Sequence, residues 1–229
     1  MSNVRVLTGN LFTSSCAVLV NTVNCVGVMG AGLALECRLR YPAMYQQYTR
    51  LCEKGLLQVG KLWMFDAGER QILNFPTKTH WRNPSQPAYL RAGLEKFMQT
   101  YQARGIESVA FPLLGTQHGG LDPEAALQLM RDYLDACEVP VEIYRHDTKA
   151  RDDLFDRFKD TFAGATDEQV RAASGLRAPQ IRALRKALES TRVRQLNQLA
   201  ACDGVGDKTL EAAFAMTRME TLPGQPALF

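Results

Sequence analysis

The chain has 229 residues, of which 46% are hydrophobic and 22% are charged, and its formal net charge is +3. This length predicts one large domain, or a medium domain followed by a small one. The composition is typical of a soluble globular protein, and the net charge is too small to define a partner. We find neither an apolar run near the ~18 residues of a membrane span nor the apolar region of a signal peptide, so we expect a cytoplasmic protein.

The first 146 residues alternate between strand and helix patterns. Short β-branched and apolar segments predict strands, and apolar residues at helical spacing predict helices. Such alternation predicts a mixed α/β sandwich with a largely parallel sheet. The expected strands are residues 4–12, 17–24, 61–68, 70–76, 108–115 and 139–145, and the expected helices are residues 33–54 (interrupted before Pro42), 88–104 and 122–137, the last with Asp122 as its N-cap.

After His146 no strand pattern returns. Short helices are expected at residues 153–163, 166–175, 178–189, 193–201 and 208–218. The sequence therefore predicts a domain of residues 1–148 and a small all-α domain of residues 149–229. Residues 221–229 are expected to be frayed or strapped to the surface.

Six cysteines occur without a CxxC pair, and only three histidines are present. These features argue against a zinc site, and we expect no metal. Single cysteines within apolar segments are typical of small buried residues in a reducing compartment, and they do not indicate a disulfide framework.

Two glycine-rich loops share one design. Residues 24–32 (NCVGVMGAG) and 115–121 (GTQHGGL) each follow a predicted strand and precede a predicted helix. Such loops present bare N–H groups to an anion, and they meet at the carboxyl ends of parallel strands, so we expect the two to clamp a diphosphate. The alternative is that the glycines only make tight turns. GxGxxG after the first strand and GxxxxGK[ST] are both missing, which disfavours Rossmann and P-loop folds.

Four motifs carry a resemblance to a known family. They are TGNLF (residues 8–12), VNTVNCVGVMGAGLAL (20–35), NFPTKTHWR (74–82) and PLLGTQHGGLD (112–122). Together they resemble a macrodomain and, within that superfamily, the DarG antitoxin branch, whose members remove ADP-ribose from DNA bases. The resemblance covers about residues 3–146 and implies a three-layer α/β/α macrodomain fold, with ADP-ribose as ligand and product and no cofactor.

The resemblance also implies a set of ligand contacts. ADP-ribose would be bound by Thr8, Gly9, Asn10, Leu11, Asn21, Asn24, Gly27, Val28, Met29, Gly30, Gly32, Leu33, Thr77, Leu113, Gly115, Thr116, Gln117, His118 and Gly119. Asn10 stands where macrodomains normally have the Asp that recognises adenine; its amide oxygen is expected to accept from the adenine amino group, without the charge. Asn24 is expected to reach the distal ribose. Ala31 replaces a lysine frequent in the DarG branch, which removes one phosphate contact.

The NFPTKTHWR motif holds the candidate catalytic residues. In the DarG branch the lysine of NFPTK is needed for hydrolysis, so Lys78 is the expected catalytic residue, with His80 and Asn24 assisting. Cleavage of the bond between ribose and base passes through an oxocarbenium-like transition state, and Lys78 could donate a proton or attack the sugar. His80 is expected to relay a proton or contact a base, or else to be a surface histidine.

Trp81 and Arg82 complete the motif. Trp81 is expected to stack on an extruded base, with a partly buried loop anchor as the alternative. Arg82 is expected to meet a phosphate of the nucleic acid. Pro76 is expected to be the point where the strand leaves the ladder.

The helical region carries a second, shorter resemblance. LNQLAACDGVGDKTLEAAF, near residues 196–214, resembles a helix-hairpin-helix element that grips a DNA phosphate. Backbone N–H groups at Gly204, Val205 and Gly206, with the charge of Lys208, would make that contact. The alternatives are a plain turn between two helices of a bundle with a solvated basic face, or a surface that holds a toxin.

These observations predict a hydrolase that removes ADP-ribose from nucleic acid, most simply DNA, as an antitoxin or repair activity opposing an ADP-ribosyltransferase toxin. Three alternatives stay open. The chain could bind ADP-ribose without turnover, hydrolyse protein-linked or acetylated ADP-ribose, or neutralise a toxin by sequestering it.

Overall fold

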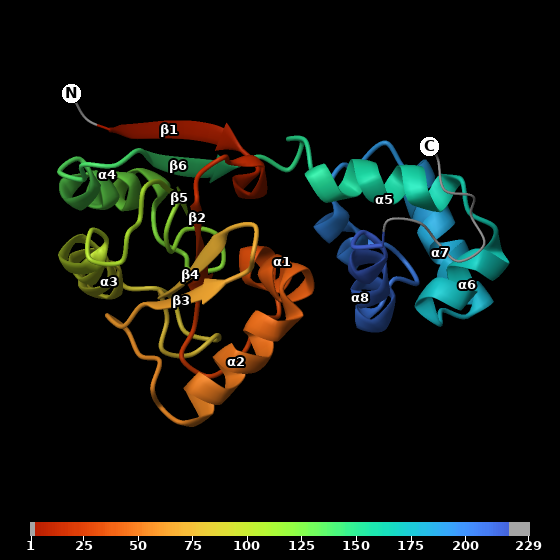
Figure 1. Ribbon diagram of the computed structural model, residues 1–229, viewed down its shortest axis with the longest axis horizontal. Helices are drawn as coiled ribbons and strands as arrows, with labels where there is room; N and C mark the ends of the chain where they lie inside the picture. The colour runs from red at the N-terminus through yellow and green to blue at the C-terminus, as the bar shows by residue number, and fades with distance from the viewer. Residues whose placement is uncertain (1–2, 220–229) are drawn as a thin grey trace. The chain divides into compact units, whose positions relative to one another are not determined.

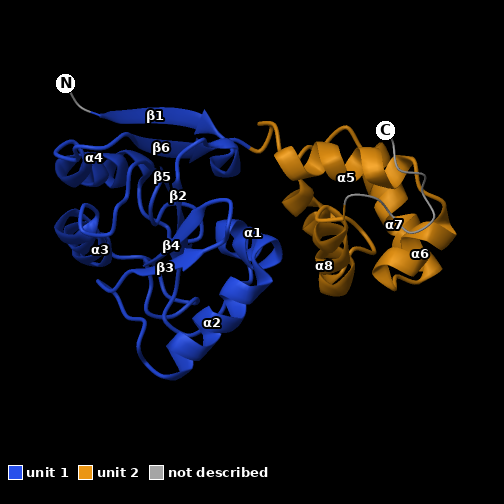
Figure 2. Cartoon of the chain, in the orientation of Figure 1, with its two compact units in different colours: residues 1–147 blue, residues 148–229 orange. Residues whose placement is uncertain are grey.

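The computed structural model describes residues 3–219 (Figure 1). It divides the chain into two compact units, unit 1 of residues 1–147 and unit 2 of residues 148–229 (Figure 2). The boundary predicted from the sequence lies one residue further along the chain. The tail predicted at residues 221–229 lies outside the described residues.

Unit 1 is built on a six-stranded sheet in the order β1-β6-β5-β2-β4-β3. Neighbouring strands pair in parallel, except that β3 runs antiparallel to β4 across the turn at Ala67 and Gly68. This arrangement confirms the mixed, largely parallel sheet. The strands are β1 (Val4–Gly9), β2 (Val18–Val23), β3 (Trp63–Asp66), β4 (Gln71–Pro76), β5 (Val109–Pro112) and β6 (Val141–His146).

Helices cover both faces of the sheet (Figure 1). One face packs against α3 (Pro87–Thr100) and α4 (Pro123–Leu134) through a core that includes Phe75, Phe97 and Phe111. The other packs against α1 (Gly32–Arg40), α2 (Pro42–Glu53) and the short 3-10 helix η1 (Leu11–Thr13). Because successive strand residues point to opposite faces, β2 supplies Val18 and Val20 to the first core and Leu19 to the second. The three-layer prediction is confirmed.

The helices begin where the sequence signals indicate. Pro42 occupies the first turn of α2, so that α1 ends at Arg40 and the predicted interruption separates two helices. The Asp122 carboxylate accepts a hydrogen bond from the Ala125 N–H at 2.9 Å, which confirms it as the N-cap of α4. These local signals separate α1 from α2 and place the start of α4 directly behind the second glycine loop.

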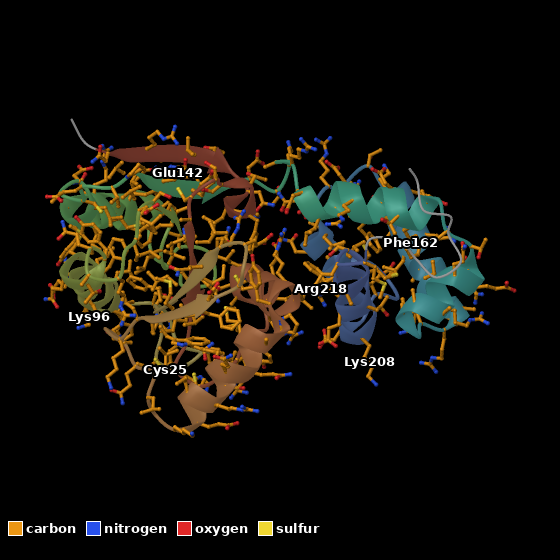
Figure 3. All side chains as sticks on the ribbon, in the orientation of Figure 1. Cys25, Lys96, Glu142, Phe162, Lys208 and Arg218 are labelled. Atoms are coloured by element: carbon orange, nitrogen blue, oxygen red, sulfur yellow. The ribbon has the colours of Figure 1, made fainter. Side chains whose placement is uncertain are left out.

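A buried carboxylate fixes the segment that follows β1. Glu142 on β6 is 4% exposed and receives hydrogen bonds from Arg5 (2.5 Å), the Ser14 hydroxyl (2.6 Å) and the Tyr144 hydroxyl (3.1 Å) (Figure 3). Burial by itself would raise the pKa of Glu142, but the Ser14 and Tyr144 hydrogen bonds and the Arg5 guanidinium hold that pKa below its usual value. The network anchors the residues that follow Asn10.

Unit 2 is all-α within the described residues. Its elements are α5 (Asp153–Ala163), α6 (Asp167–Ser174), α7 (Ala178–Glu189), the 3-10 helix η2 (Leu196–Ala201) and α8 (Asp207–Met216). Buried apolar side chains from these elements, among them Phe158, Ile181 and Phe214, form its own core. The helix expected at residues 193–201 is therefore a shorter 3-10 helix, and the others occur as predicted. No helix among residues 3–219 is long and apolar enough to cross a membrane.

Candidate functional site

The first glycine loop, residues 24–32, joins β2 to α1 and is organised by Asn24. The Asn24 side-chain oxygen accepts from the N–H groups of Val26 (3.0 Å) and Val28 (3.3 Å) and from the Tyr48 hydroxyl (3.1 Å), and its amide donates to the Val28 carbonyl (2.5 Å). Asn24 is 7% exposed. The Asn24 oxygen therefore holds the loop, and only one of its two amide hydrogens is used in these bonds, so the reach of Asn24 to a ribose stays a prediction.

The second glycine loop, residues 115–121, joins β5 to α4 and closes on itself. The N–H of Leu121 donates to the Gly115 carbonyl at 3.0 Å, and that of Gly120 to the Thr116 carbonyl at 2.9 Å. A Cβ at Gly119 would lie 2.1 Å from the Gly115 oxygen and 2.5 Å from the Ser85 hydroxyl oxygen. Only glycine fits at position 119, because a Cβ there would collide with a backbone oxygen, which cannot rotate away as a side chain can.

The two loops meet. A Cβ at Gly32 would lie 2.9 Å from a ring carbon of His118, and Gly32 itself has a positive φ of 55°. Glycine is thus required at 32 both by backbone conformation and by the approach of the second loop. The predicted meeting of the loops at the carboxyl edge of the sheet is present.

Lys78 follows β4 and lies at this meeting point. Its ammonium donates a hydrogen bond to the backbone carbonyl of His118. Desolvation by its surroundings lowers the pKa of Lys78. The structure therefore joins the predicted catalytic lysine directly to the second glycine loop.

The backbone around Lys78 stays attached to the first loop. The Thr77 N–H donates to the Val23 carbonyl at 2.9 Å, and the Cys25 N–H donates to the Thr79 carbonyl at 3.2 Å. The Cys25 thiol also donates to the Lys78 carbonyl at 3.3 Å (Figure 3). The strand ends at Pro76, as expected, and these bonds hold the segment that follows it against β2 and the first loop.

His80, Trp81 and Arg82 form a surface stack. The rings of His80 and Trp81 lie 5.6 Å apart at 25°, and the Arg82 guanidinium carbon lies 4.6 Å from the centre of the Trp81 ring. Trp81 is 46% exposed, so part of its ring is open to solvent, and both stacking on a base and a partly buried loop anchor stay open. The His80 Nδ1 accepts from the Arg82 N–H at 3.2 Å, which leaves its Nε2 to face outward contacts.

Two predicted ligand residues are used inside the fold. Asn21 is fully buried and donates through its amide to the Asn74 side-chain oxygen at 2.9 Å, so the structure places it within the sheet and not at a ligand surface. Met29 is 1% exposed and packs in the core against α2, so a ligand contact there would have to use its backbone. Burial contradicts a side-chain contact for Asn21, whereas a backbone contact at Met29 stays a prediction.

Asn10 lies at the start of η1 and is 4% exposed. Its side-chain oxygen accepts from the Phe12 N–H at 3.0 Å, and its amide nitrogen is buried without a hydrogen-bond partner among the described residues. The oxygen expected to receive the adenine amino group is thus already used once. The polar atom of Asn10 that has no partner is the amide nitrogen, which is a hydrogen-bond donor.

The remaining predicted contacts fall into two groups. Within the two glycine loops, Gly27, Val28, Gly30, Thr116, Gln117 and His118 are at least partly exposed, as are the neighbouring residues Leu33 and Leu113. Elsewhere, Thr8 is exposed at the end of β1, whereas Gly9, Leu11 and Thr77 are buried. Of these loop residues, His118 is the one that contacts both Lys78 and Gly32.

Sequence reasoning missed Ser85 and Tyr48. The Ser85 N–H donates to the Gly119 carbonyl at 2.9 Å, and its buried hydroxyl oxygen has no partner among the described residues. The Tyr48 hydroxyl donates to the Asn24 carbonyl at 2.8 Å, and burial raises its pKa. Neither residue lies in a recognisable motif segment, so no local signal could have found them.

The predicted helix-hairpin-helix contact in unit 2 is only partly available. Gly204 and Gly206 are exposed, and Lys208 lies at the exposed start of α8 (Figure 3). The Val205 N–H, however, donates to the Cys202 carbonyl at 3.1 Å, so the expectation that it points at a phosphate is wrong. On α7, the Arg185 guanidinium is already paired with the Asp167 carboxylate and the Ala165 carbonyl.

Comparison with known proteins decides the family. The Macro domain family matches residues 20–130, all within unit 1. The solved structure of the macrodomain of Thermus aquaticus DarG is 40% identical, with a TM-score of 0.58, and the match covers 63% of this chain and 97% of that one. The chain belongs to the macrodomain family.

Several macrodomain relatives have a named activity. "DNA ADP-ribosyl glycohydrolase" proteins of Mycobacterium tuberculosis and Thermus aquaticus are 43% and 41% identical over 141 and 146 residues, covering 59% and 62% of this chain. The chain spans about two-fifths of the length of these curated relatives (40% and 41%). The solved structure of Thermosipho africanus DarTG in complex with ADP-ribose is 33% identical with a TM-score of 0.62, covering 66% of this chain and 43% of that one.

Proposed function

We propose that this macrodomain protein removes ADP-ribose from ADP-ribosylated DNA. The observation that carries the proposal is the hydrogen bond from the Lys78 ammonium to the second glycine loop, at the point where that loop meets the first. The relatives named DNA ADP-ribosyl glycohydrolase support the same activity. ADP-ribose is the ligand and the product, and no cofactor is needed.

The proposed reaction breaks the bond between the anomeric carbon of the ribose and a base nitrogen. Water adds its hydroxyl to the anomeric carbon, and the departing base nitrogen takes up a proton, so that free ADP-ribose and the unmodified base result. The transition state carries positive charge on the sugar, and the leaving base needs a proton or a hydrogen bond. The chain therefore has to hold the diphosphate and deliver one proton-bearing group.

Lys78 can take this task in two ways. As an ammonium it donates the proton to the leaving base; as a neutral amine it attacks the anomeric carbon and water later releases the sugar. Desolvation lowers the pKa of Lys78, which makes its ammonium a stronger acid and its neutral amine more populated than in a solvated lysine. A diphosphate on the second loop would also contact the peptide whose carbonyl now holds the ammonium.

The stack of His80, Trp81 and Arg82 is suited to the base and its strand. An exposed indole edge or face offers stacking area to an extruded base, and an adjacent guanidinium offers charge to a phosphate. We assign Trp81 to the base and Arg82 to the backbone of the DNA. His80 is assigned to the edge of the base through its Nε2.

The partner that creates the substrate would be an ADP-ribosyltransferase. One relative, 34% identical over 161 residues, is named as a fusion of a DNA ADP-ribosyl transferase with a DNA ADP-ribosyl glycohydrolase. We propose that this chain opposes such a toxin as an antitoxin.

An oligonucleotide assay tests the proposal. A single-stranded oligonucleotide ADP-ribosylated by a DNA ADP-ribosyltransferase is incubated with the full chain, and mass spectrometry follows the oligonucleotide and the released ADP-ribose. Release of ADP-ribose with recovery of the unmodified mass is the expected result. Binding without release would instead indicate a reader, and release only from an ADP-ribosylated protein or an acetylated ADP-ribose would indicate the other hydrolase activities.

A further inference from the structure

Unit 2 contains a groove that none of the predicted site residues lines. It has a volume of about 470 Å³ and lies among α5, the end of α7 and the segments 149–151 and 190–194. Phe155, Leu188 and Val193 supply its apolar part, and Ser190 and Thr191 supply hydroxyls. The groove belongs wholly to unit 2.

The charged residues that line this groove are mainly basic. Four are cationic (Lys149, Arg151, Lys159 and Arg194) and two are acidic (Asp156 and Glu189). Arg151 and Asp156 form an ion pair at 3.0 Å, but their side chains are 83% and 53% exposed. Exposed pairs of this kind contribute little, so Arg151 can exchange the carboxylate for another anion. We call this surface the basic groove.

Buried polar contacts hold two walls of the basic groove together. Asp152 is 1% exposed and accepts from the N–H groups of Leu154 (3.0 Å) and Leu196 (2.6 Å). The fully buried Gln195 donates from its amide to the Ala150 carbonyl at 3.1 Å, and Gln198 donates to the Thr148 carbonyl at 2.7 Å. The segment that carries Arg151 is thus pinned to the one that carries Arg194.

This pinning has a consequence for binding. Positive charges that are far apart in sequence are held near one another before any ligand arrives, so little ordering is required on binding. The turn at residues 203–206 offers less: it carries one flanking lysine, Lys208, and the Val205 N–H is already used. The basic groove is therefore the better-built anion surface of unit 2.

We propose that the basic groove binds the phosphate backbone of the nucleic acid on which unit 1 acts. This assignment rests on the proposed function, since that function makes a polynucleotide the substrate. Arginine, lysine and hydroxyl side chains are the usual partners of backbone phosphates, and all three kinds line the groove. Because unit 2 is covalently joined to unit 1, a strand held in the groove raises its effective concentration at the glycine loops.

The test measures binding to DNA that carries no ADP-ribose. Fluorescence anisotropy follows the full chain with a labelled, unmodified single-stranded oligonucleotide at several salt concentrations. The double variant Lys159→Gln with Arg194→Gln removes two groove charges. The matched control, Arg171→Gln with Lys186→Gln, removes two charges of unit 2 that do not line the groove. Circular dichroism confirms that both variants fold.

The groove variant is expected to bind about tenfold more weakly, and the slope of log K against log salt is expected to fall by about 1.4, whereas the control follows the wild type. Equal weakening in both variants would overturn the assignment, because charge alone would explain it. Loss of DNA binding by the Lys208→Gln variant, together with wild-type binding by the groove variant, would also overturn the assignment, because it would favour the turn at residues 203–206. Binding of an acidic peptide in place of DNA would also overturn it.

Failure of the groove assignment can be distinguished from failure of the proposed hydrolase function. Hydrolysis is measured on a modified mononucleotide, which has no polynucleotide backbone for the groove to hold. If that reaction proceeds while unmodified DNA fails to bind, the groove assignment falls and the hydrolase stands. If DNA binds at the groove while no ADP-ribose is released, the hydrolase falls.

Discussion

The Lys78 ammonium donates a hydrogen bond to the backbone carbonyl of His118, which links residues 40 positions apart in the chain. This bond connects the proposed catalytic group directly to the loop that is proposed to hold the diphosphate. Anything that displaces the second loop also displaces Lys78.

Replacement of Lys78 by alanine is expected to remove hydrolysis and to spare ligand binding. Loss of a positioned acid or base typically costs about 10²–10⁴-fold in rate. The glycine loops keep their backbone donors, so the affinity for free ADP-ribose, measured by calorimetry, should change only a few-fold. Lys96→Ala on α3, far from the loops in sequence and exposed, is the control. Turnover by the Lys78 variant near the wild-type rate would contradict the catalytic assignment.

The pH dependence of the rate distinguishes the two roles of Lys78. Desolvation lowers its pKa, so the ammonium loses its proton below the ordinary lysine value of 10.5. If the ammonium is the acid, the single-turnover rate falls as pH rises through that lowered pKa. If the neutral amine is the nucleophile, the rate rises over the same range. A borohydride trap that captures a sugar on Lys78 would support the second role, and a rate that stays independent of pH through 10.5 would contradict both.

Gly119→Ala is expected to weaken ADP-ribose binding by about tenfold or more, equivalent to ~1.4 kcal/mol. Its Cβ would lie 2.1 Å from the Gly115 oxygen, so the second loop has to open. Gly120→Ala is the matched control: Gly120 has a positive φ of 76°, but a Cβ there would meet nothing within 4 Å. That change should lower stability by about 1–2 kcal/mol and leave affinity nearly unchanged. Equal affinities for both variants would argue against this loop as the diphosphate site.

Asn10→Asp is expected to raise the affinity for ADP-ribose by roughly three- to tenfold. A carboxylate keeps the bond from the Phe12 N–H, removes the unpartnered amide nitrogen and adds a charged acceptor for the adenine amino group. Calorimetry with ADP-ribose and with its hypoxanthine analogue, which lacks that amino group, checks the cause. The gain should be confined to the adenine ligand; an equal gain for both would place the amino group elsewhere.

Glu142→Gln is expected to destabilise unit 1 by about 1–3 kcal/mol near neutral pH. The folded-state pKa of Glu142 is depressed below its ordinary value of 4.5, so its ionised form contributes stability above 4.5, which is lost as pH falls through the depressed pKa. The difference between wild type and variant should therefore shrink in acid. Both tryptophans, Trp63 and Trp81, lie in unit 1, so their fluorescence reports its unfolding. Glu107→Gln, at an exposed position, should show no such convergence.

Much of the fold was readable from the sequence because its signals are local. Alternating strand and helix patterns predicted the sheet, Asp122 and Pro42 marked helix starts, and the two glycine loops marked the ligand edge. The prediction of a helix at residues 193–201 was wrong in type and extent, since only the last six of these residues are helical and they form a 3-10 helix.

The sequence by itself determined which residue types gather around the loops, since the loop glycines and Lys78 belong to short contiguous motifs. Only the tertiary structure decided how those side chains are used. It turned Asn21 and Met29 inward, committed the Asn24 oxygen to its own loop, and added Ser85 to the second loop. It also pinned Arg151 beside the segment of Arg194 through Asp152 and Gln195. The physical reason is that a polar group takes its hydrogen-bond partner from whatever the packed chain brings within about 3 Å, and partners such as Gly119 for Ser85 or Leu196 for Asp152 lie tens of residues away.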